Sequence, residues 1–133
     1  MISTRGRYAL RVMIDLAENQ SDKYIPLKDI AARQEISKKY LEIIVKDMVH
    51  GGLLKGTSGK GGGYKLCRPA EDYTVGEILE MMEGSLSPVA CLADPDYECS
   101  RREECQTLPM WNEFDTLVHD YFYGKRLTEL CRL

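Results

Sequence analysis

Three of the five cysteines, Cys91, Cys99 and Cys105, lie within fifteen residues of one another. Seven residues separate the first two and five separate the last two. Thiolates bind zinc and iron–sulfur clusters, and three of them suffice where a fourth ligand comes from elsewhere. The Cys-x-x-Cys pairs typical of zinc ribbons are absent, so the spacing favours an iron–sulfur cluster over zinc. Unligated thiols and a reversible disulfide switch are the alternatives.

The other candidate ligands lie apart from this group. We expect structural roles for Cys67 and Cys131, and His50 and His119 are isolated in the sequence. The chain has no apolar run long enough to cross a membrane and no signal-peptide pattern, which predicts a cytoplasmic protein with no membrane partner. In that reducing compartment, an odd number of cysteines favours metal or redox chemistry over a disulfide framework.

Charge divides the chain into two unlike halves. Residues 1–70 contain thirteen Lys and Arg against seven Asp and Glu, a net charge of +6. Residues 71–133 contain five against fourteen, a net charge of −9. A basic half beside an acidic half indicates a polyanionic partner for the first, despite the overall charge of −3.

Apolar residues recur at helical spacing over 4–19, 26–33 and 37–50. Ser37 is placed to cap the third helix, and only four residues connect it to the second. Two short helices joined so tightly predict a helix-turn-helix. Lys38 opens the third helix away from its apolar stripe, next to Lys39. Cations at a helix start gain nothing from the helix dipole, so both indicate an external anion.

A glycine-rich loop follows, between apolar pairs that predict short strands at 53–54 and 64–66. This pattern predicts a β-hairpin wing with Ser58 and Lys60 at its tip. A helix and a hairpin that both carry cations match a major-groove helix and a wing that grips the DNA backbone. The alternative is a winged helix used only for protein contact, whose lysines are merely solvated. The predicted DNA contacts are Arg5, Arg7, Lys28, Ser37, Lys38, Lys39, Tyr40, Glu42, Ser58, Gly59, Lys60 and Gly61.

Four of these residues have more specific expected roles. Tyr40 donates to a phosphate, or alternatively packs half-buried beneath the wing. Glu42 accepts from cytosine N4 at a base edge. Arg5 and Arg7, near the amino end of the chain, reach backbone phosphates or stay solvated.

The rest of the chain adds a fourth helix, a loop and a last helix. Thr74 and Glu77 form a capping-box pattern before the fourth helix. Residues 85–108 show no helical or strand period. The last helix begins near Pro109 and carries an aromatic face that needs a partner surface. The fold class is therefore mainly α with a small β-hairpin wing: a winged helix-turn-helix at 1–84, a cysteine-containing loop at 85–108, and a long helix and tail at 109–133. The partner-facing residues are Trp111, Phe114, Leu117, Val118, Tyr121 and Phe122.

Five segments, STRGRYALRVMIDLA, ISKKYLEIIVKDMVHGGLLKG, GKGGGYKL, TVGEILEMMEG and CQTLPMW, occur in an order that resembles the IscR/NsrR/CymR regulators, known as the Rrf-two type. The resemblance spans nearly the whole chain. It implies a winged-helix homodimer joined through the long carboxyl-terminal helix, which binds double-stranded DNA. It also implies a two-iron or four-iron cluster on the cysteines that correspond to Cys91, Cys99 and Cys105.

The chain departs from this family at three places. Leu108 stands where the iron–sulfur-assembly regulator has its histidine ligand, so the fourth ligand is unassigned. Ser58 stands where related proteins often carry an arginine for the minor groove. Seven residues separate the first two cysteines, where the best-known cluster-binding members have five. Relatives devoted to cysteine metabolism lack the three cysteines, so their presence favours cluster sensing.

The resulting hypothesis is a homodimeric transcriptional regulator, and not an enzyme, that sets its two recognition helices about one DNA turn apart on a pseudo-palindrome. The state of a cluster on the three-cysteine loop biases their separation. One alternative is a regulator without a cluster, controlled by thiol oxidation or by a protein partner. Another is a thiol oxidoreductase, which needs a base beside a cysteine; the sequence shows none near the three.

Overall fold

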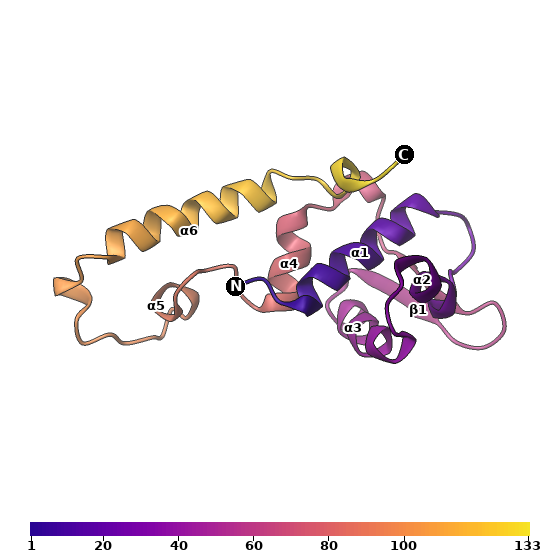
Figure 1. Cartoon of the computed structure of the whole chain (residues 1–133), viewed down its shortest axis with the longest axis horizontal. Coiled ribbons are helices and arrows are strands. Elements are labelled where there is room, and N and C mark those ends of the chain that lie inside the picture. The colour runs from indigo at the N-terminus through magenta and orange to yellow at the C-terminus, as the bar shows by residue number, and fades with distance from the viewer.

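The computed structural model describes all residues, 1–133. Three helices form its amino-terminal body: α1 (Thr4–Glu18), α2 (Leu27–Gln34) and α3 (Lys38–His50). Their bounds confirm the expected helices to within two residues. Figure 1 shows α1 running across the centre of the body, with α2 and α3 beside it. The fully buried side chains that these helices contribute are Ala9, Val12, Met13, Ile30, Leu41, Ile44, Val45 and Met48.

The turn between α2 and α3 is fixed at both ends. Glu35 ends α2 in the left-handed conformation, with φ of 55°. The backbone N–H of Ile36 then donates to the carbonyl of Ala31 at 3.1 Å, and the Ile36 side chain is buried. On the other side, the Ser37 hydroxyl accepts from the N–H of Tyr40 at 3.4 Å. The turn therefore sets the direction in which α3 leaves the body.

A buried carboxylate joins α1 to α2. Asp15 is 1% exposed and accepts two hydrogen bonds from the Arg33 guanidinium, at 3.0 and 2.7 Å. Gln34 donates a third at 3.1 Å. A buried charge is costly unless it is paired and hydrogen-bonded, and these three bonds satisfy Asp15.

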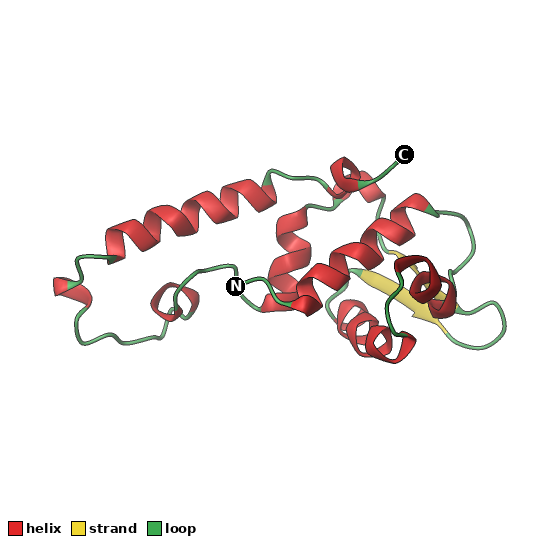
Figure 2. Ribbon diagram, in the orientation of Figure 1, coloured by secondary structure: helices red, strands yellow, loops and turns green.

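The wing is a two-stranded antiparallel sheet of β1 (Leu54–Thr57) and β2 (Gly63–Leu66). Figure 2 shows it in yellow beside the helices of the body. Tyr64 also exchanges two backbone hydrogen bonds of 2.9 Å with Ile25, ahead of α2. Gly63 is required there, because its φ is +149° and a Cβ would lie 2.1 Å from the Ile25 carbonyl oxygen.

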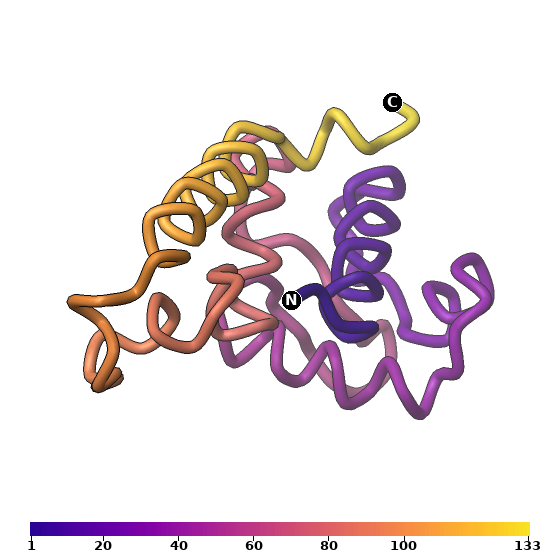
Figure 3. Tube along the Cα trace, turned by 60° about the vertical axis from the view of Figure 1, so that its left-hand side comes forward, coloured from indigo at the N-terminus to yellow at the C-terminus, as the bar shows by residue number.

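Helix α4 (Val75–Glu83) packs against α1 and begins with the expected capping box of Thr74 and Glu77. Helix α6 (Leu108–Tyr123) packs on α4, where Gly76 leaves room for a tyrosine ring: a Cβ at Gly76 would lie 2.5 Å from Tyr123. In Figures 1 and 3, α6 and the loop before it form an arm that extends away from the body.

After α6 the chain returns to the body, which the sequence did not predict. The short 3₁₀ helix η3 (Leu127–Leu130) places Leu127 fully inside the main core. The Val75 N–H donates to the Lys125 carbonyl at 2.8 Å, and the Leu127 N–H donates to the Tyr73 carbonyl at 3.0 Å. Tyr73 itself follows the 3₁₀ helix η1 (Ala70–Asp72). The tail is therefore anchored beside the base of the wing.

The long loop contains two short helices that its sequence did not predict. They are α5 (Ala90–Ala93) and the 3₁₀ helix η2 (Arg102–Glu104), and neither contributes a buried residue. No helix in the chain is long and apolar enough to cross a membrane.

Candidate nucleic-acid interface

A groove runs between the start of α3 and the wing. One part, of about 480 Å³, is lined by Lys28 of α2, Lys38 of α3 and the wing residues Ser58 and Gly63. An adjoining part, of about 470 Å³, shares Ser58 with it and is also lined by Lys46. We call the two parts together the α3–wing groove. It gathers residues from α2, α3 and the wing that the sequence placed on one interface.

Within this groove, Glu42 lines both parts. Lys46 lies one helical turn further along α3 and was missed by the sequence reasoning. The signal that identifies it is its spacing of four residues from Glu42, which puts the two side chains on one face of a helix. The face of α3 that lines the groove therefore offers one acceptor between two cations, Lys38 and Lys46.

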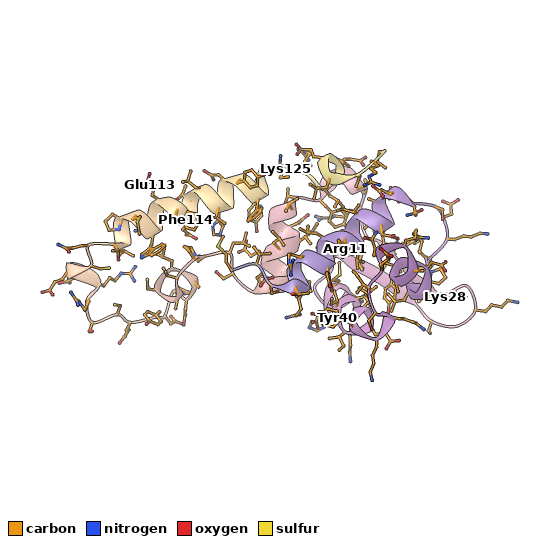
Figure 4. The ribbon with its side chains drawn as sticks, in the orientation of Figure 1. Arg11, Lys28, Tyr40, Glu113, Phe114 and Lys125 are labelled. Atoms are coloured by element: carbon orange, nitrogen blue, oxygen red, sulfur yellow. The ribbon has the colours of Figure 1, made fainter.

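Tyr40 lies on the opposite side of the α3 start. Its ring packs edge-to-face on Tyr8 of α1, with centroids 5.6 Å apart and planes at 88°. Arg11 lies 5.4 Å over the same Tyr8 ring. The alternative that placed Tyr40 beneath the wing is wrong, because α1 and not the hairpin covers this side of α3. Figure 4 labels Tyr40 and Arg11 close to α1, and Lys28 on the side of the wing.

The amino-terminal arginines lie outside the groove. Arg5 forms a 2.5 Å ion pair with Asp47, near the end of α3 rather than its start. Arg7 donates to the hydroxyl of Thr4 at 3.1 Å. Arg5 therefore links α1 to α3, and neither arginine lines the α3–wing groove.

The tip of the wing is an exposed turn. Gly59 and Gly61 have φ of +83° and +78°, and the Gly62 N–H closes the turn on the Gly59 carbonyl at 3.0 Å. Lys60 lies between them and is exposed to solvent, as are its neighbours in the turn. Like Lys28, it forms no ion pair in the structure.

The cysteines of the loop are not gathered into a ligand set. Cys91 and Cys105 are half-buried, Cys99 is exposed, and all are free thiols. Nowhere in the chain do three His, Cys, Asp or Glu side chains converge as they would around a metal. The loop therefore has thiol ligands of suitable chemistry but not the arrangement that a cluster requires.

The thiols also differ in acidity. A hydrogen bond with the Thr107 hydroxyl, at 3.5 Å, and one from the Thr107 backbone lower the pKa of Cys105. Burial, followed by the nearby charge of Glu18, raises the pKa of Cys131. Cys131 packs against the main core, as expected of a structural residue, whereas Cys67 is exposed.

One part of the aromatic face of α6 packs against the body, and the other part is exposed to solvent. Val118 is buried against α4, and Phe122 packs beside it. Trp111 is half-buried. Figure 4 marks Phe114 on the amino-terminal half of the helix. The large apolar and aromatic side chains of α6 that remain uncovered are Met110 (52% exposed), Phe114 (41%), Leu117 (61%), Tyr121 (63%) and, at the end that packs on Gly76, Tyr123 (42%).

Comparison with known proteins identifies the family. The family model described as "Rrf2: Iron-dependent Transcriptional regulator" matches residues 2–133. This chain belongs to the Rrf2 family. Its relatives include Protein rrf2 of Nitratidesulfovibrio vulgaris, 38% identical over 98% of this chain and 87% of that protein. The HTH-type transcriptional regulator IscR of Photobacterium profundum is 32% identical over 98% of this chain and 75% of that protein.

Solved structures agree with this assignment. CymR, the global cysteine regulator of B. subtilis, superposes with a TM-score of 0.77 at 34% identity, over 98% of this chain and 95% of that one. T. potens IscR superposes with a TM-score of 0.73 at 29% identity, over 98% of this chain and 85% of that one. This Rrf2 chain is therefore a winged-helix, DNA-binding transcriptional regulator and not an enzyme.

In this Rrf2 regulator, the structure brings some predicted site residues together and separates others. Lys28, Lys38, Glu42 and Ser58 share the α3–wing groove. Ser37 and Tyr40 line a separate hollow between α3 and α1. The other predicted residues lie outside both hollows. Gly59, Lys60 and Gly61 form the exposed tip of the wing, and Arg7 and Lys39 are exposed to solvent on their helices.

Proposed function

We propose that this Rrf2 regulator grips duplex DNA in the α3–wing groove, with α3 in the major groove and the wing on the backbone. The observation that carries the proposal is a set of cations without carboxylate partners. Lys28, Lys38 and Lys46 all line the groove, and none forms an ion pair within the chain. Phosphates are the partners that such lysines favour, and neutralising them releases counterions from DNA.

The roles of residues in the groove and beside it follow from chemistry and position. Lys38 and Lys39, on the first turn of α3, contact phosphates, as do Ser37 and the wing residue Lys60. Glu42 lies inside the groove between cations, where its carboxylate accepts from cytosine N4. The lysines thus supply affinity that falls with salt, and Glu42 supplies base discrimination.

We further propose that two copies pair through α6. Its exposed apolar side chains, Met110, Phe114, Leu117 and Tyr121, are spaced by four, three and four residues. This is the spacing by which two helices pack along a seam. A stripe of this kind left open to water marks a protein interface. Two copies related by a twofold axis present two α3 helices to a pseudo-palindromic operator.

For control of the regulator we propose the loop of Cys91, Cys99 and Cys105 as the site of an iron–sulfur cluster. Because the three thiols do not converge in the structure, ligation requires the loop to close. The family description "Iron-dependent" and the lowered pKa of the Cys105 thiol, which hydrogen bonds with Thr107 cause, support this assignment. When bound, a cluster supplies a cross-link that is sensitive to iron and oxidants. In agreement with its DNA-binding relatives, we also place the action of this regulator in the cytoplasm.

The lowered pKa of Cys105 favours a second mode of control, which is direct oxidation of this thiol. A thiol with a lowered pKa is the one that oxidants attack first. The regulator then responds to thiol oxidation without any metal.

Fluorescence anisotropy tests the proposed function. A labelled duplex from the protein's own promoter region is compared with a shuffled duplex of equal length and composition. We expect saturable binding to the promoter duplex, tighter by at least about 10³-fold than to the shuffled one. Equal affinity for both duplexes would contradict sequence-specific regulation.

Iron and sulfide analysis with anaerobic absorption spectra tests the ligand assignment. Wild type is compared with Cys91→Ala, Cys99→Ala and Cys105→Ala, and with Cys67→Ala as the matched control. We expect iron to be lost from the first three variants only. The same iron content in all five proteins, or none in wild type reconstituted with iron and sulfide, would leave thiol oxidation as the mode of control.

A further inference from the structure

A second basic hollow lies on the other side of the wing from α3. It has a volume of about 400 Å³ and is bounded by the end of α1, the segment before α2, both wing strands and the chain that follows β2. Four cationic side chains line it: Lys23, Lys55, Lys65 and Arg68. None of these residues lines the α3–wing groove.

The register of the wing explains why the two hollows are separate. Lys55 of β1 lies directly opposite Lys65 of β2, so their side chains share one face of the sheet. The next pair, Gly56 and Tyr64, points to the other face, and both residues line the α3–wing groove. The hairpin therefore has one side toward α3 and another toward the second hollow.

The charges in this hollow are poorly compensated. Like charges directly opposite each other on paired strands repel, and Lys55 and Lys65 are such a pair. Lys23 and Lys55 have no ion-pair partner, and Lys65 Nζ contacts only the Asp22 carbonyl, at 3.3 Å, and the face of Tyr24. An anion placed between these lysines relieves their repulsion.

The other two charged groups differ from the lysines. Arg68 pairs with Glu77 and lies 4.2 Å over the ring of Tyr73, which holds its guanidinium in place. Glu71 is the one acidic side chain that lines the hollow. The lining thus carries an excess of positive charge.

The remaining lining gives the hollow an apolar part. Leu16, Ile25, Leu66 and Pro69 contribute to it. A concave site of a few hundred Å³ that combines apolar walls with convergent charged groups is typical of a small-molecule site. We propose that this hollow binds a small organic anion that carries two or more negative charges, through carboxylate or phosphate groups. DNA phosphates are the less favoured source of that charge, because the hollow opens on the face of the wing opposite to α3.

Calorimetry and thermal unfolding of the DNA-free protein test the proposal, with citrate and pyrophosphate as probes at constant ionic strength. The test variant is the double substitution Lys55→Gln and Lys65→Gln. The matched control, Lys39→Gln with Lys60→Gln, removes the same charge from the DNA-facing side. At a probe concentration about 100 times its Kd, we expect Tm to rise by about 5–10 °C in wild type and control. In the test variant we expect binding at least about tenfold weaker.

Two outcomes would overturn this proposal: an equal response of all three proteins to both probes, or no response in wild type. A DNA titration then separates the sources of negative charge. If the Lys55 and Lys65 variant loses DNA affinity while neither probe binds wild type, these lysines contact DNA phosphates instead. Circular dichroism checks that the variant is folded. Should it unfold, the exposed Lys23→Gln variant repeats the test with the same expected loss.

Discussion

The hydroxyl of Tyr73 donates a 2.8 Å hydrogen bond to the carbonyl of Leu53, at the base of the wing. The same oxygen accepts from the N–H groups of Cys67 and Arg68, at 3.0 and 3.2 Å. The Tyr73 carbonyl in turn accepts from Leu127, after α6. One buried residue therefore ties both roots of the wing to the segment that follows the proposed dimerisation helix.

This arrangement predicts that Tyr73→Phe destabilises the fold by about 1–3 kcal/mol. The substitution keeps the ring in the core but leaves the buried carbonyl of Leu53 and the partly buried N–H of Cys67 without their partner. Urea unfolding measures the effect, and Tyr97→Phe on the exposed loop is the matched control. The same free energy of unfolding in both variants would show that the hydroxyl of Tyr73 contributes nothing.

The buried ion pair of Asp15 gives a second prediction. Asp15→Asn leaves Arg33 and Gln34 without their anionic acceptor and is expected to cost about 3 kcal/mol, the lower end for breaking a buried pair, because Arg33 is partly solvated. Denaturant unfolding measures it against Asp22→Asn, whose side chain is exposed. We expect DNA affinity to fall only in parallel with the folded fraction. A variant as stable as wild type would contradict the account of how α1 holds α2.

The acidity of the thiols predicts their order of reaction. Because hydrogen bonds from Thr107 lower the pKa of Cys105, more of this thiol is ionised at neutral pH than in an ordinary cysteine. Burial raises the pKa of Cys131, so less of it is ionised. Mass spectrometry after brief iodoacetamide treatment should find Cys105 alkylated severalfold faster than Cys131. Thr107→Val should slow the alkylation of Cys105 and leave the alkylation rate of Cys131 unchanged. If Cys131 of the wild type were alkylated faster than Cys105, the assignment of the more ionised thiol would be refuted.

The exposed stripe of α6 predicts the effect of a charge at Leu117. A leucine buried at an interface contributes about 1.5–3 kcal/mol, and a symmetric dimer loses two. Leu117→Glu should therefore raise the dimer dissociation constant by at least about 10²-fold. Sedimentation velocity measures it, with Asn112→Glu elsewhere on the exposed surface of α6 as control. Dimers of equal stability in the two variants would place the interface elsewhere.

Local patterns in the sequence were sufficient for much of this fold. Helical spacing, the Ser37 cap and the capping box of Thr74 and Glu77 depend on neighbours within a turn, and each was predicted correctly. The tail was not, because Leu127 enters a core built by residues more than forty positions earlier, and nothing in its own neighbourhood indicates that contact. For the same reason, one prediction packed Tyr40 beneath the wing, whereas Tyr40 packs on Tyr8 of α1.

The lining of the α3–wing groove, which we propose as the DNA site, was predicted in part. Lysines at a helix start and a glycine-rich tip are visible as residue types, which is why Lys28, Lys38 and Ser58 were found. Lys46 and the separation of the two faces of the wing depend on orientation in the folded chain. The three-cysteine loop shows that proximity in sequence does not ensure proximity in space, because Cys91, Cys99 and Cys105 do not come together in the structure.

The dependence of DNA affinity on salt tests the central claim most directly. Wild type, Lys38→Gln, Lys46→Gln and Lys125→Gln are titrated with promoter duplex over a range of salt concentrations. Lys125 serves as control because it pairs with Glu129 beyond the end of α6. We predict that each groove substitution reduces the slope of log Kobs against log[salt] by about one, and that Lys125→Gln leaves it unchanged. Identical slopes for all four proteins would contradict DNA binding in the α3–wing groove.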